Sequence, residues 1–303
     1  MENPHQTNWP VLSYEKGKDT YKTVHLFSQI IGKIKLKSLP WINHSWHVAL
    51  IVTPSGLTTS LLPYGERHFQ IEFDFCQHKL RMTTNMSEMV EFKLEGLSVA
   101  EFYKKTMDSL ASLKIDIKIN RKPNEIPDAV VFDEDHTNKT YDKEQVTLLH
   151  RALMNAQTVF TDFRSEFKGK CSPIHFFWGS FDLAVTRFSG RKAPTHPGGV
   201  PNLPDSVAEE AYSHEVISCG FWPGNDALPQ AVFYSYSYPE PDGFKAASIL
   251  PIEAYYNTAF GEFILPYEAV QKAANPREKV LEFLRSTYQA GAGLGNWDIE
   301  SFT

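Results

Sequence analysis

The sequence predicts an α+β fold with two halves, each combining antiparallel strands and helices. Apolar residues recur at helical spacing near both ends of the chain, shorter segments alternate between apolar and polar residues, and turn-forming residues separate these segments. The halves are either distinct or parts of a single fused domain. A weak sequence similarity between residues 53–56 and 186–190 would fit weak internal pseudo-symmetry or a duplication.

The N-terminal half, residues 1–120, is predicted to run helix, strands, helix, strand. Apolar residues at spacings of three and four predict a first helix over 19–37. A capping box, Ser98-x-x-Glu101, starts the second helix, and residues 115–119 follow as a short strand. The strands between the two helices are expected at 46–53, 57–62, 68–75, 79–84 and 89–94.

Residues 121–142 are rich in proline and acidic side chains and lack periodicity, so we predict a linker there. In the C-terminal half, residues 143–303, Asp142 caps a long helix with an apolar stripe. Asn275 followed by proline starts the last helix. Strands are expected at 214–222, 232–238 and 262–265, the first two forming a hairpin.

The segment 169–191 combines a thiol, a histidine, a carboxylate, two arginines and five aromatic rings. Ser172 and Pro173 match a helix N-cap and first position, and the apolar residues after them fall on one helical face. A strand is the alternative, favoured by the aromatic content. Because about 16 residues are ordinary for a helix and long for a strand, we prefer the helix.

On such a helix His175 and Asp182 lie on one face, roughly 10 Å apart, with Gly179 as a notch between them. We expect this arrangement to hold a small ligand and to supply acid–base groups. In the strand alternative the two side chains are about 23 Å apart and cannot act together. The simpler interpretation is that both are packed polar residues.

Cys171 is a candidate nucleophile at the start of the predicted helix. A helix N-terminus and the neighbouring Lys170 both favour the thiolate, and His175 lies four residues away. A small buried cysteine is the commoner alternative.

Other side chains complete the predicted site. Arg187 and Arg191 are expected to hold an anionic group through bidentate hydrogen bonds, unless they form a solvated charge cluster. His214 and Glu215 are adjacent on a strand and point to opposite faces, so only one can enter the pocket as the acid or base. We favour His214, which would exchange protons with His175 in an enzyme. The aromatic walls of the pocket are assigned to Trp178 and Tyr236.

Composition excludes several classes of protein. The net charge of −6 argues against a nucleic-acid binder. No leader sequence and no apolar run of about 18 residues is present, so we expect a cytoplasmic protein without a membrane span. Three widely spaced cysteines do not form a disulfide framework. No metal site is predicted, and neither a cofactor nor an oligomeric state is indicated.

Several motifs extend along nearly the whole chain. They include Trp9-Pro10, Pro123-Asn124-Glu125, GKCSPIHFFWGSFDLAVTRFSGR at 169–191, EAYSHEV at 210–216 and FYSYSYPEP at 233–241. In these motifs the chain resembles a family of bacterial proteins known only as a domain of unknown function. The resemblance implies a bacterial origin and assigns no catalytic residue.

The leading hypothesis is a cytosolic binding protein or enzyme for a small, anionic molecule. Its pocket is expected between the 171–191 segment and the 212–238 hairpin. The alternative is a structural or protein-interaction module without catalytic activity, which would meet its partner through exposed rings around Trp222 and Tyr234.

Overall fold

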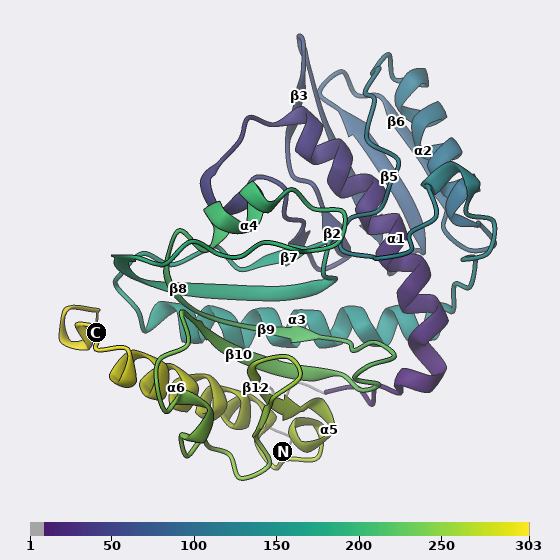
Figure 1. Ribbon diagram of the computed structural model, residues 1–303. Helices are drawn as coiled ribbons and strands as arrows, with labels where there is room; N and C mark the ends of the chain where they lie inside the picture. The colour runs from purple at the N-terminus through teal and green to yellow at the C-terminus, as the bar shows by residue number, and fades with distance from the viewer. Residues whose placement is uncertain (1–8, 303) are drawn as a thin grey trace.

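The computed structural model describes residues 9–302, which form six α-helices and two antiparallel sheets (Figure 1). The predicted α+β fold with two sheet-plus-helix halves is confirmed. One large apolar core includes residues from both halves. Phe132, within the segment predicted as a linker, is buried in this same core. The division of the chain at residues 121–142 stays a prediction.

The N-terminal sheet has six strands in the order β1-β2-β4-β5-β6, with β3 also paired to β4. Helix α1 (Tyr14–Ser38) contacts α2 (Val99–Ser112), which packs beside this sheet (Figure 1). The strands are β1 (Ile51–Val52), β2 (Gly56–Thr58), β3 (Leu62–Tyr64), β4 (Arg67–Asp74), β5 (Lys79–Thr84) and β6 (Met89–Lys93).

The C-terminal sheet also has six strands, in the order β11-β12-β10-β9-β8-β7. They are β7 (His175–Phe177), β8 (Asp182–Lys192), β9 (His214–Trp222), β10 (Val232–Tyr238), β11 (Tyr255–Asn257) and β12 (Glu262–Pro266). The remaining helices are α3 (Lys143–Ser165), α4 (Asp205–Ala211), α5 (Tyr267–Gln271) and α6 (Pro276–Leu294). None of the helices within 9–302 is both long and apolar enough to cross a membrane.

The two faces of the C-terminal sheet have different environments. Helices α3 and α6 contact each other and cover one face through β8, β9, β10 and β12 (Figure 1). Because successive strand residues point to opposite faces, Leu183 and Val185 join this core while Asp182 and Ala184 point the other way. The second face therefore carries the residues that can form a site.

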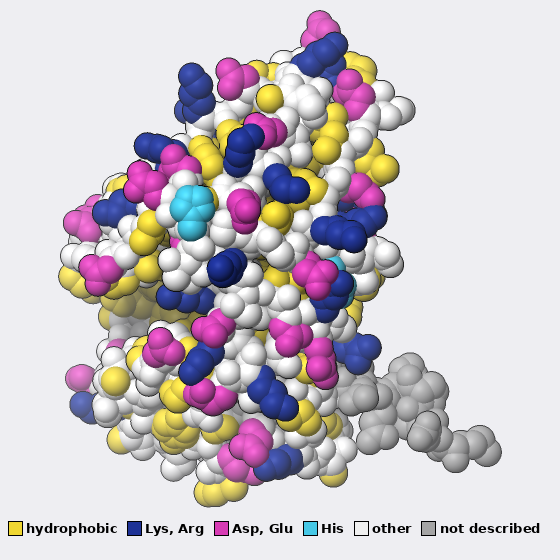
Figure 2. Space-filling view, turned by 90° about the vertical axis from the view of Figure 1, so that its right-hand side faces the viewer, with side chains coloured by type: hydrophobic (Ala, Val, Ile, Leu, Met, Phe, Trp, Pro, Cys, Tyr) yellow, Lys and Arg dark blue, Asp and Glu magenta, His cyan; other side chains and the backbone are white. Residues whose placement is uncertain are grey.

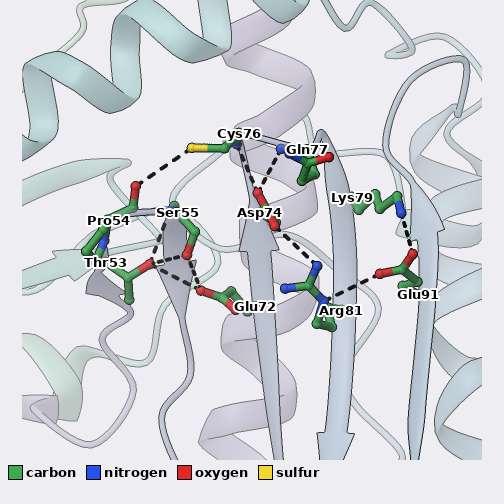
Figure 3. Close-up of polar contacts among 11 residues, drawn as sticks. Thr53, Pro54, Ser55, Glu72, Asp74, Cys76, Gln77, Lys79, Arg81 and Glu91 are labelled. Atoms are coloured by element: carbon green, nitrogen blue, oxygen red, sulfur yellow. Dashed lines mark hydrogen bonds and ion pairs between the residues drawn. The ribbon is translucent and has the colours of Figure 1, made fainter.

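The polar face of the N-terminal sheet is occupied by its own ion pairs (Figure 3). Arg81 bridges Asp74 and Glu91, and Lys79 also pairs with Glu91. Asp74 additionally accepts the backbone N–H groups of the turn that follows β4. On the side of the molecule in Figure 2, basic and acidic side chains are likewise interspersed, without a broad patch of one sign.

Local signals at element boundaries were predicted correctly. The capping box of Ser98 and Glu101 is present, and the Asp142 side chain accepts the backbone N–H groups of Glu144 and Gln145. The Asn275 side chain likewise caps α6, whose first residue is proline. The β9–β10 hairpin and the polar alternation of β4 match the predicted segments closely. These signals depend on a few neighbouring residues, so long-range packing does not change them.

The predicted helix after Ser172 is wrong, because residues 175–192 form the β7–β8 hairpin. Its turn is made by residues 178–181, where Phe181 adopts a φ of 62°. The Ser172 side chain accepts the backbone N–H of Thr186, so it supports strand pairing and caps no helix. The wide separation of His175 and Asp182 expected for an uninterrupted strand is also wrong. The turn folds the chain back and places Asp182 opposite Phe177.

Three predicted strands also differ from the structure. The run at 46–53 is reduced to β1, because residues 46–48 continue the turn that begins with the 3-10 segment at 43–45. The 57–62 segment divides into β2 and β3 at Ser60, which has a φ of 60°. Residues 115–119 alternate between buried and exposed positions, yet they pair with no strand among residues 9–302.

Trp178 fixes the β7–β8 turn against α1. Its indole N–H donates a hydrogen bond of 2.9 Å to the Val48 carbonyl, and its ring covers Gly32. A β-carbon at Gly32 would lie 2.2 Å from the indole ring, which leaves no room for a side chain. Gly32 therefore allows α1 to approach the hairpin closely.

Two glycine-to-alanine substitutions should change stability in opposite directions. Gly32→Ala should destabilise the fold by about 1–3 kcal/mol, because the methyl group overlaps the Trp178 ring. Gly293→Ala on α6 meets nothing within 4 Å and should stabilise by up to about 1 kcal/mol. Urea unfolding measures both changes. Equal effects at the two sites would contradict the close packing of Gly32.

Candidate functional site

A cavity of about 1310 Å³ lies on the face of the C-terminal sheet opposite α3 and α6. Its floor follows the alternation of the strands, because every second residue points into it. Strand β12, which lies between β11 and β10, contributes a single carboxyl group to this floor. The floor side chains include His175, Phe177, Asp182, Ala184, Thr186, Phe188, Val216, Ser218, Tyr234, Tyr236 and Glu262.

The roof comes from parts of the chain that are far apart in sequence. It consists of α1, residues 41–48, residues 124–127 and a strap that we define as residues 193–213. The strap includes α4 and is closed at its neck by a hydrogen bond of 3.1 Å from Ala193 N–H to the Ser213 carbonyl. Its apolar side chains Val200, Leu203, Val207 and Ala208 face the cavity.

Three of the carboxyl groups that line this cavity are buried or half-buried, namely Glu125, Asp182 and Glu262, whereas Asp19 and Asp226 are exposed. Burial, together with the charge of Asp182, raises the pKa of Glu125 to about 7 and that of Glu262 to about 8. Burial also raises the pKa of Asp182, although hydrogen bonds from Ser180 and Tyr234 oppose that shift. Asp182 therefore acts on both glutamates, and these two hold protons near neutral pH.

Asp182 is part of a hydrogen-bonded row along the sheet. It accepts from the hydroxyl groups of Ser180 and Tyr234. The Tyr234 ring stacks on the Tyr236 ring at 6.2 Å, and the Tyr236 hydroxyl lies 2.8 Å from that of Tyr212 on the strap. Burial raises the pKa of each of these tyrosines, so they remain neutral hydrogen-bonding groups.

Glu125 is held in place by the residues around it. The neighbouring Asn124 accepts from the Lys33 ammonium group and exchanges two hydrogen bonds, of 2.7 and 2.9 Å, with the Gln29 side chain on α1. The backbone N–H of Glu125 donates to the Pro201 carbonyl of the strap. A β-carbon at Gly179 would lie 1.9 Å from the Glu125 carboxyl, so the Gly179 notch is where this carboxyl sits.

Two of the histidines that line the cavity, His25 and His175, are uncharged over most of the pH range. Burial lowers the pKa of His25 and of His175 to about 4 in each case. The His175 Nδ1 atom lies 2.8 Å from the Ala184 carbonyl, and the His25 Nε2 atom lies 2.8 Å from the Gly179 carbonyl. Neither imidazole supplies a positive charge to balance the carboxyl groups.

Half of the residues predicted for the site lie together at the cavity. His175, Trp178, Gly179, Asp182 and Tyr236 all line it. The hairpin brings them there by alternation and by its turn, instead of by the helical face that the sequence suggested.

Arg187 lies on the other side of the sheet. Alternation along β8 turns it towards the core, where its guanidinium group is 3.5 Å from the Phe163 ring centroid and 4.4 Å from that of Tyr288. It also donates to the Phe163 carbonyl and is 3% exposed. Its role in this structure is to join α3, α6 and the sheet.

Arg191, Glu215 and His214 also lie outside the cavity. The Arg191 guanidinium pairs with the Glu215 carboxylate at 2.7 Å. His214 is on the same face of β9 as Ser218 but near the end of the strand, where its Nδ1 atom lies 3.1 Å from the Ser213 hydroxyl. These three residues form surface contacts beyond the edge of the cavity.

Cys171 forms an isolated antiparallel bridge with Arg187 of β8 and lines no part of the cavity. The helix terminus expected to favour its thiolate is absent, and burial raises the pKa of its thiol. The structure also gives no metal site, since no cluster of three histidine, cysteine or acidic side chains in residues 9–302 is placed to hold an ion.

A family model described as a family of unknown function, DUF5996, matches residues 9–303. The chain belongs to the DUF5996 family. No curated protein and no solved structure matches it significantly. The match to DUF5996 therefore gives the family and brings no residue roles with it.

The sequence-based prediction missed two carboxyl groups of this DUF5996 chain, Glu125 and Glu262. Glu125 stands in the segment expected to be a linker, but Pro123-Asn124-Glu125 was among the motifs that carried the family resemblance. Glu262 opens a predicted strand, and its alternation with Phe263 could have placed it on the polar face.

The raised pKa values of Glu125 and Glu262 predict how stability depends on pH. In the unfolded chain both carboxyl groups have an ordinary pKa of about 4.5, whereas in the folded state they stay protonated up to a pKa of about 7 or 8. The folded state therefore loses free energy of unfolding as pH rises from about 4.5 to about 8. The loss is about 1.4 kcal/mol per pH unit for each group. Relative to wild type, E125Q and E262Q should therefore gain unfolding free energy between pH 5 and pH 8. An exposed control, E66Q, should not. Parallel curves would contradict the raised pKa values.

Thiol labelling tests the predicted nucleophile. At about pH 7.5, iodoacetamide should modify exposed Cys76 first, and Cys171 should react at least tenfold more slowly because burial raises the pKa of its thiol. Cys219, which is 2% exposed, should react only after unfolding. Mass spectrometry of peptides measures the order. Faster labelling of Cys171 than of Cys76 would revive its assignment as a nucleophile.

Proposed function

We propose that this protein binds a small organic molecule in the cavity on the C-terminal sheet. The cavity itself carries the proposal. At about 1310 Å³ it is large enough for a metabolite-sized ligand, and it combines apolar walls with a few fixed polar groups, as ligand sites do. Aromatic rings from separate parts of the chain, including Trp46, Phe177, Trp178 and Trp222, supply these walls.

Two earlier expectations lose their support in this geometry. Anion binding depended on Arg187 and Arg191, which face the core and the surface respectively. A flat partner-binding surface depended on exposed rings at Trp222 and Tyr234, but both rings are half-buried and line a concave site. A bound small molecule is therefore favoured over a docked protein.

Acid–base catalysis is a second candidate function, and the protonation of Glu125 and Glu262 favours it. A carboxylic acid with a pKa of about 7 or 8 can give or take a proton at neutral pH. In this version the carboxyl groups take the roles first considered for His175 and His214. The imidazole of His175 has a pKa of about 4, and His214 lies outside the cavity.

A fragment screen by ligand-observed NMR tests the proposed function. Fragments that bind the wild-type protein should lose at least about tenfold in affinity to Ala184→Phe, whose ring would occupy the cavity floor. Val207→Trp, on the strap, should have the same effect from the roof. Thr158→Phe, exposed on α3, is the matched control and should bind normally. The proposal fails if no fragment binds, or if binding survives in both cavity-filling variants.

A further inference from the structure

We infer that the ligand of this cavity carries a positive charge, an ammonium or comparable cationic group that binds among Glu125, Asp182 and Glu262. The inference rests on the proposed function and adds the chemical class of the ligand. Its basis is the charge balance of the cavity, the hydrogen-bonding groups that remain free, and the rings that line the same cavity.

The charge balance is one-sided. Among residues 9–302, no lysine or arginine forms an ion pair with Glu125, Asp182 or Glu262, and the lysines that line the cavity are Lys18 and Lys22. Lys18 at the mouth is already paired with Glu15, and Lys22 is exposed on α1. Buried carboxylates are normally paired, so a cationic ligand would supply the missing partner.

Glu125 is the clearest case of a carboxyl group without a partner among residues 9–302. Its side chain reaches into the Gly179 notch, is largely enclosed by protein and makes neither a hydrogen bond nor an ion pair with another of the described residues. Asn124 and the strap nevertheless hold its backbone firmly, as described above. A carboxyl group fixed in a cavity without a protein partner is an acceptor available to a ligand.

Several hydrogen-bond donors of the cavity are used within the protein. The Trp178 indole N–H donates to the Val48 carbonyl, the Trp41 indole to Glu210, and the Asn124 amide to the Asn202 carbonyl. The Tyr234 hydroxyl donates to Asp182. Because these donors are used while the Glu125 carboxyl has no partner among the described residues, that carboxyl can accept from a ligand that carries N–H donors or a positive charge.

Aromatic rings line the same cavity as these carboxyl groups. The Tyr234 hydroxyl donates to Asp182, the Tyr234 ring stacks on that of Tyr236, and the Tyr236 hydroxyl lies 2.8 Å from that of Tyr212. Ring faces attract cations, and sites for quaternary ammonium groups combine such rings with carboxylates. The cavity therefore provides both kinds of group that such a ligand requires.

The test compares cations with neutral molecules of the same shape. Choline is paired with 3,3-dimethylbutan-1-ol and benzylamine with benzyl alcohol, and isothermal titration measures the four affinities at about pH 8. In at least one pair the cation should bind at least about tenfold more tightly. E125Q and E262Q should reduce that preference several-fold, whereas the exposed control E66Q should keep it.

Salt provides a second measurement that needs no variant. Raising the NaCl concentration should weaken binding of the cation more than that of its neutral partner. The inference is overturned if no pair shows a preference for the cation, including the case in which neither member binds. The proposed function would still stand if the fragment screen yields ligands that the cavity-filling variants lose. The proposed function would be contradicted together with this inference only if the fragment screen also fails.

Discussion

The alternation of side chains along β8 is the constraint on which the site depends. Asp182 and Arg187 are five residues apart on one strand, and this odd spacing sends them to opposite faces of the sheet. Arg187 is enclosed by rings of α3 and α6, while Asp182 faces the cavity. The positive charge of Arg187 is thereby separated from the negative charge of Asp182, so this strand contributes a carboxyl group and no basic side chain to the cavity.

Such a cavity is costly to maintain without a ligand. Desolvation acts on Glu125 and Glu262, and the response is protonation, which removes the charge near neutral pH. The fold keeps Glu125 in place through the contacts of Asn124 with α1, and keeps Asp182 in place through Tyr234. Binding of a cation would replace these protons. Stability and recognition therefore act on the same groups.

The sequence predicted those parts of the fold that local chemistry decides. Ser98, Asp142 and Asn275 cap helices as expected, since a cap needs only the N–H groups two or three residues away. Partner-dependent features were not predictable in the same way. Ser172 followed by proline resembles a helix start, but its side chain meets the backbone of Thr186 across the sheet.

The same limit applies to the candidate site. His175, Asp182 and Tyr236 were recognised from their chemical types, and the structure places them at one cavity by a different geometry. Glu125 looked like part of an acidic linker, because nothing near it in sequence shows that α1 and the strap would hold it. Its role follows from contacts across about 80 to 100 residues of chain, which periodicity does not report.

The roof of the cavity has a consequence for how the molecule matures. It is assembled from α1, residues 41–48, residues 124–127 and the strap, whereas the floor lies between residues 175 and 262. Helix α1 and residues 41–48 and 124–127 precede the whole floor in the chain, whereas the strap lies within it, between β8 and β9. During synthesis the tyrosine-bearing face of the sheet can be fully covered only after α1 meets strands that are made later. The glutamates owe their unusual acidity to burial, so that acidity requires this closure.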